Sequence, residues 1–76
     1  MIAKDVVKEI MALKKLSQSK LAEKAGFKSQ SNITGILNRG TTMKVNNLKQ
    51  MLSAMGYKII VVPDEAPIPE GGYAID

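Results

Sequence analysis

The 76-residue sequence contains no cysteine and no histidine. Without cysteine, neither a disulfide nor a thiolate-bound metal can brace so small a core. Together the two absences remove the common zinc ligand sets and the usual pairs of nucleophile and base. We therefore expect one small domain near the lower size limit for independent folding, with no metal, no cofactor and no enzymatic activity.

Long apolar runs are also missing from the N-terminal end. The first ten residues, MIAKDVVKEI, interleave charged and apolar side chains. A signal peptide or a membrane-spanning helix has a different pattern, because both need an uninterrupted apolar stretch. We expect a cytoplasmic protein without a membrane partner.

Basic residues are absent from the C-terminal end. All eleven Lys and Arg residues lie between Lys4 and Lys58, so the part of the chain up to Val62 has a net charge of +8. A compact basic body suits a polyanionic partner, although lysines kept for solubility would give the same charge. Residues 63–76 contain four acids, three prolines and two glycines. We expect them to form an acidic, disordered tail that is either a spacer or a phosphate mimic.

Apolar spacing predicts a mostly α-helical domain. The expected helices cover residues 3–16, 18–25, 30–38 and 45–55. Their apolar stripes include Val6, Val7, Ile10 and Leu13 in the first helix and Val45, Leu48, Leu52 and Met55 in the fourth. Ser17 and Ser29 are suited to cap the second and third helices. Gly26 and Gly56 are suited to end the second and fourth.

Residues 57–62, YKIIVV, predict a β-strand, because β-branched and aromatic residues favour strands. No second strand is predicted in the chain, and a lone strand leaves its backbone groups unpaired. We expect pairing with the same strand of a second copy across a two-fold axis. The dimerising residues would be Tyr57, Ile59, Ile60, Val61 and Val62. The alternative is a strand that packs flat on the body of residues 1–62 without pairing.

The second and third helices are joined by only a few residues around Gly26. Leu21 and Ala22 of the second helix are placed to pack against the apolar stripe of the third. That stripe consists of Ile33, Ile36 and Leu37. Two short helices with so tight a connection cross steeply, which is the helix-turn-helix arrangement.

The outward side of the third helix has no charged residue from Ser29 to Asn38. Amide and hydroxyl side chains can read the donors and acceptors of base edges in the DNA major groove. The candidate base-reading residues are Gln30, Ser31, Asn32, Thr34 and Asn38. The cations Lys28 and Arg39 stand on either side of this stretch, as expected of residues that contact phosphate.

The stretch SQSKLAEKAGFKSQSNITGILNRG resembles the helix-turn-helix of the Cro and phage-repressor (XRE) family. Gln18, Leu21, Ala22 and Gly26 match its pattern Gln-x-x-Leu-Ala-x-x-x-Gly in identity and spacing. The resemblance covers about residues 5–57 and implies a four-helix, λ-repressor-like domain. It further implies that Gln18 contacts a phosphate and orients the recognition helix.

Two features depart from the pattern of this family. The gap from Gly26 to Ile33 is one residue longer than usual, which shifts the turn or the start of the recognition helix. Gly35 stands where a third base contact is expected, and it has no side chain with which to read a base. The glycine instead permits a close approach to another backbone or helix.

These observations together predict a dimeric, nucleoid-associated repressor of phage or mobile-element origin that binds a palindromic operator in double-stranded DNA. The candidate phosphate contacts are Gln18, Lys28, Ser29, Arg39, Thr41, Thr42 and Lys44. One alternative is an antitoxin that represses its own operon and binds a toxin. Another alternative is a protein-interaction module that keeps the helical fold without binding DNA.

Overall fold

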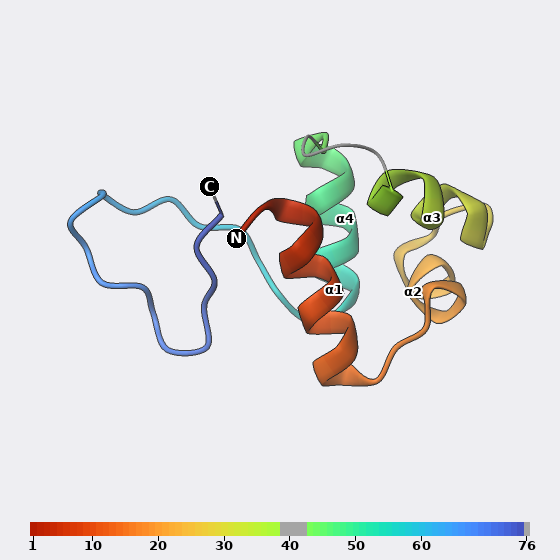
Figure 1. Cartoon of the computed structure of the whole chain (residues 1–76), viewed down its shortest axis with the longest axis horizontal. Coiled ribbons are helices and arrows are strands. Elements are labelled where there is room, and N and C mark those ends of the chain that lie inside the picture. The colour runs from red at the N-terminus through yellow and green to blue at the C-terminus, as the bar shows by residue number, and fades with distance from the viewer. Residues whose placement is uncertain (39–42, 76) are drawn as a thin grey trace.

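The computed structural model describes residues 1–38 and 43–75, with Gln30 described in its backbone only. Its helices are α1 (Ala3–Lys14), α2 (Gln18–Ala25), α3 (Gln30–Asn38) and α4 (Val45–Ala54). Figure 1 shows α1 and α4 side by side, with α2 and α3 on one side of them and the C-terminal residues on the other. The four predicted helices are confirmed, with ends that differ by at most two residues.

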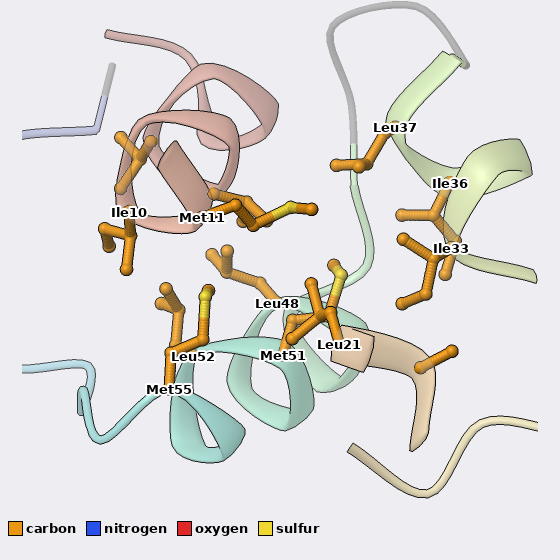
Figure 2. Packing of buried hydrophobic residues seen from close by; sticks show 13 residues of the cluster. Ile10, Met11, Leu21, Ile33, Ile36, Leu37, Leu48, Met51, Leu52 and Met55 are labelled. Carbon is orange, nitrogen blue, oxygen red and sulfur yellow. The ribbon is translucent and has the colours of Figure 1, made fainter. Parts of the chain in front are cut away.

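The core forms where α4 lies between α1 and α2. Figure 2 shows Met51 and Leu52 of α4 among side chains from the other helices, with the apolar residues of α3 pointing toward them. Met51, Leu21 and Ile33 are completely buried. The full set of buried apolar residues is Val6, Val7, Ile10, Met11, Leu21, Ala22, Ile33, Ile36, Leu37, Leu48, Met51, Leu52 and Met55.

Two residues that were predicted to be buried are exposed. Leu13 is 63% exposed and Val45 is 68% exposed. At about 3.6 residues per turn, a stripe centred on Val7 and Ile10 continues through Met11, and Leu13 falls to its side. Val45 is the first residue of α4 and lies at the exposed end of its stripe, whereas Met51 is completely buried.

Three helices end in the same way. After α2, Phe27 N–H donates to Ala22 O (3.0 Å) and Gly26 N–H to Glu23 O (3.4 Å), which is the Schellman pattern. The corresponding pairs after α1 and α4 are Leu16 to Met11, Lys15 to Ala12, Tyr57 to Leu52 and Gly56 to Ser53. The apolar residue of each end packs against the core, so each helix end also fixes the exit of the chain.

The left-handed residue of this pattern is glycine after α2 and α4 but lysine after α1. Gly26 has φ +81° and Gly56 has φ +84°, whereas Lys15 has φ +56°. The left-handed conformation brings the Cβ atom of an L-residue too close to the backbone, and only glycine avoids this contact. Lys15 therefore holds an unfavourable conformation that the rest of the helix end imposes.

Replacing Lys15 by glycine should stabilise the protein. We expect Lys15→Gly to raise the free energy of unfolding by about 0.5–1 kcal/mol, because glycine adopts this φ without the steric contact. The matched control is Lys14→Gly, one residue earlier and inside α1. This variant should lower the free energy of unfolding by about the same amount. Urea unfolding of both variants measures the difference. Equal decreases in the free energy of unfolding of Lys15→Gly and Lys14→Gly would show that the end of α1 does not require the left-handed conformation.

Residues 57–62 form no β-strand in the part of the chain that the structure describes. Ile59, Ile60 and Val62 are 43–51% exposed, and Val61 is 96% exposed. The segment therefore does not pack flat on the body. A strand needs a hydrogen-bonded neighbour, and residues 1–38 and 43–75 of one chain offer none. Pairing with a second copy stays a prediction.

The acidic tail contains two reverse turns. Ala66 N–H donates to Pro63 O at 3.0 Å, and Gly72 N–H donates to Pro69 O at 2.9 Å. Proline and glycine favour turns, so these residues redirect the chain and bring it back toward the body. Figure 1 shows the resulting loop. Asp76 lies outside the described residues, and disorder of the tail stays a prediction.

The returning chain contacts the body through Tyr73. The ring centroids of Tyr73 and Tyr57 are 6.4 Å apart, and both side chains pack against the core. Beside them the N-terminal amine of Met1 donates to Ala74 O at 3.2 Å. Partial removal from water raises the pKa of Tyr73, and the negative charges of Glu9 and of ionised Tyr57 act in the same direction. The tail therefore ends beside α1.

Candidate nucleic-acid interface

Both ends of α2 are fixed by hydrogen bonds. At its start, Ser17 Oγ accepts from the backbone N–H of Lys20 at 3.1 Å, which confirms the predicted N-cap. At its end, Gln50 Nε2 of α4 donates to Ala25 O at 2.6 Å. This second bond satisfies a carbonyl that has no partner within the helix and holds α2 to α4. The position of α2, against which α3 packs, is therefore fixed at both ends.

The buried stripe of α3 determines which of its side chains face solvent. Ile33 and Leu37 are completely buried, and Ile36 is nearly so. Helical spacing then places Ser31, Gly35 and Asn38 on one outward line. Asn32 and Thr34 lie on opposite sides of this line. Ser31, Asn32 and Asn38 are exposed, whereas Thr34 and Gly35 are partly buried.

Thr34 and Gln18 form a hydrogen bond that joins α3 to α2. Thr34 Oγ1 donates to Gln18 Oε1, and both side chains are partly buried. The Thr34 hydroxyl is therefore engaged within the protein, and the oxygen of the Gln18 amide is fixed in position. No described residue accepts from the amide nitrogen of Gln18. Sequence reasoning missed this pair, although the predicted crossing of the two helices pointed to contacts of this kind.

The turn before α3 is closed by two serines. Ser29 Oγ and Ser31 Oγ are 2.7 Å apart and share a hydrogen bond. The backbone N–H of Asn32 donates to Ser29 O at 3.2 Å, which starts the helix. Both serine side chains are exposed and can still accept or donate one further hydrogen bond.

Basic side chains stand at both edges of this region. Lys28 lies in the turn before α3, Lys44 directly precedes α4, and both are exposed. Arg39, Thr41 and Thr42, the other candidate phosphate contacts, lie outside the described residues. The side chain of Gln30 is outside them too, although its backbone begins α3. In the sequence, the exposed Lys28 therefore precedes the uncharged helix α3, and the exposed Lys44 follows it.

The acidic tail lies far from this face. Figure 1 places α3 and the tail at opposite ends of the long axis, with α1 and α4 between them. The molecule measures 39 Å along that axis, longer than the Debye length of about 8 Å at physiological salt. In this arrangement the acids do not cover α3, and the phosphate-mimic interpretation of the tail has no support from it.

No helix in the described ranges 1–38 and 43–75 has both the length and the apolar character needed to cross a membrane. In those ranges no three His, Cys, Asp or Glu side chains gather as metal ligands would. The uncharged face of α3 with its basic edges is thus the surface that calls for a chemical explanation.

The bond between Thr34 and Gln18 can be tested in the free protein. We expect Thr34→Val to lower the free energy of unfolding by about 0.5–1.5 kcal/mol, because it removes the hydroxyl and keeps the shape. Thr34→Ser keeps the donor and serves as the control. In a Gln18→Ala background, Thr34→Val should have almost no effect in chemical denaturation. An effect of the same size in both backgrounds would contradict the bond.

Comparison with known families completes the description of this surface. A model of the helix-turn-helix family matches residues 7–62, which include most of α1, all of α2 to α4 and the segment after α4. No curated protein and no solved structure gives a significant match. The family match covers well over half of the chain and contains the α2–α3 pair whose geometry is described above. The chain belongs to the Cro/XRE-like helix-turn-helix family of DNA-binding transcription regulators.

Proposed function

We propose that this protein is a dimeric repressor that inserts α3 into the major groove of a palindromic operator. The observation that supports this most directly is the exposed, uncharged face of α3 bearing Ser31, Asn32 and Asn38. A helix that only needed solubility would carry charged residues on this face. Base edges, in contrast, are read by amides and hydroxyls, and carboxylates near phosphate are repelled.

The proposed base-reading residues are polar residues of α3. Asn32 supplies an amide that can form two hydrogen bonds with one base, most often adenine, and Gln30 supplies a second such amide. Ser31 and Asn38 add a hydroxyl and an amide on the outward line. Thr34 has a supporting role, because its hydroxyl holds Gln18. Its methyl group and the lone pairs of its hydroxyl oxygen remain for contact with a base.

The proposed phosphate contacts lie before and after the base-reading residues in the sequence. The amide nitrogen of Gln18 has no partner among the described residues and lies at the start of α2, where the first backbone N–H groups also lack helical partners. Such a site attracts phosphate. Lys28, Ser29 and Lys44 extend the contact along the DNA backbone. Arg39, Thr41 and Thr42 belong to the same proposal by their position in the sequence.

This division between readers and phosphate contacts predicts two kinds of variant. We expect Asn32→Ala and Gln30→Ala each to lower affinity for the preferred duplex by a factor equivalent to about 1–3 kcal/mol, with little change for a scrambled duplex. Lys28→Ala should weaken both duplexes alike and reduce the slope of log affinity against log salt by about 1. Lys8→Ala, on α1, is the control and should leave the slope unchanged. Equal effects of Asn32→Ala on both duplexes would contradict the assignment.

Dimerisation would use residues 57–62. Val61 is 96% exposed in the single chain, and its apolar neighbours on both sides are also exposed. Tyr57 N–H donates to Leu52 O, but the backbone groups of residues 58–62 form no hydrogen bond among the described residues. Such an exposed apolar segment is suited to pair with a copy of itself, because both the backbone and the side chains then become covered. A two-fold dimer places two copies of α3 in half-sites about one helical turn of DNA apart, about 34 Å.

The dimer can be tested by placing a charge in this segment. We expect the wild-type protein to sediment with the mass of two chains and Val61→Asp with the mass of one, because pairing would bring two carboxylates into an apolar interface. Ile68→Asp, a similar change at an exposed position of the tail, is the control and should remain dimeric. A wild-type protein that sediments as one chain would exclude this mode of dimerisation.

Two biological settings suit such a repressor. A regulator of phage or mobile-element origin needs only the operator and the dimer. An antitoxin also needs a surface for a toxin. The C-terminal residues, which Figure 1 shows at the end opposite to α3, include exposed apolar side chains such as Val61 and Ile68. Co-expression with the product of the adjacent gene distinguishes the two, because only an antitoxin should form a stable complex with a toxin there.

A further inference from the structure

A glycine lies in the middle of the outward side of α3. Gly35 shares its line along the helix with Ser31 and Asn38, and it is the sixth of the nine residues of α3, Gln30–Asn38. Glycine inside a helix destabilises it relative to alanine, because the glycine backbone loses more freedom on folding. Its presence here therefore requires a reason.

The free protein supplies no such reason. Gly35 is not among the described residues with positive φ, so its backbone suits any amino acid. A Cβ atom built on Gly35 has no atom of the described residues within 4 Å. Thus none of the described residues needs the space, and alanine would fit among them without displacing anything. We therefore look for the cause in a bound partner.

We propose that Gly35 is the point at which the backbone of α3 approaches most closely to the floor of the DNA major groove. This inference rests on the proposed function and specifies how deeply the helix enters. Ser31 and Asn38, the polar residues on the same line, have short side chains. Short side chains reach base edges only when the helix backbone itself lies close to the bases. A Cβ atom between them would keep the backbone away.

Gly35→Ala should have opposite effects on the stability of the free protein and on its affinity for DNA. We expect it to raise Tm by about 4–8 °C, since alanine restores helix propensity at a site with free space. Affinity for the preferred duplex should fall about tenfold or more, comparable to losing one base-pair contact. Affinity for a random duplex should change less than about twofold, because that binding depends on phosphates. Gly35→Leu should lower the affinity for the preferred duplex further than Gly35→Ala does.

Ser53→Ala is the control, because Ser53 is exposed on α4 and alanine also favours the helix there. It should raise Tm slightly and leave both affinities unchanged. Wild-type affinity of Gly35→Ala for the preferred duplex would overturn the inference, as would an unchanged or lowered Tm. A wild-type protein that binds neither duplex at low salt would instead contradict the proposed function.

Discussion

The burial of one apolar stripe on α3 determines the rest of the arrangement. Ile33, Ile36 and Leu37 enter the core beside Leu21 and Met51, so the rotation of α3 about its own axis is fixed. Turning the helix by half a turn would expose three large apolar side chains, each worth about 1.5–3 kcal/mol of burial. The polar side chains of α3 do not favour one rotation of the helix to a comparable extent. The direction in which they point therefore follows from the burial of the apolar stripe.

The support for that stripe comes from α2 and α4. Gln50 holds the C-terminal end of α2, Ser17 caps its start, and Gln18 meets Thr34 of α3. The bonds of Gln50 and Gln18 join helices that the apolar contacts already bring together, whereas the Ser17 bond lies within the first turn of α2. The short connection after Gly26 leaves little freedom between the two helices. A small core without disulfides can therefore present a helix with a defined orientation.

Local features of this fold were predictable from sequence, and contacts between elements were less so. The Ser17 cap, the glycine-ended α2 and the buried stripe of α3 depend on residues near one another in the chain. Leu13 and Val45 were misplaced because spacing gives the rotation of a stripe only to within about a residue. The pairing of Gln18 with Thr34 spans sixteen residues and has no periodic signal. Residues 57–62 form no strand in the described part of the chain, and their pairing with a second copy stays a prediction.

The methionines of the core have a consequence for oxidative damage. Met11, Met51 and Met55 are at most 7% exposed, and the chain has no cysteine to react first. Peroxide converts methionine to a polar sulfoxide, which a close-packed apolar interior does not accommodate. In the folded protein only a surface methionine such as Met1 is accessible. Once an opened molecule acquires a sulfoxide at Met51, it loses the centre of its core, so oxidation makes transient unfolding permanent until a reductase repairs the sulfur.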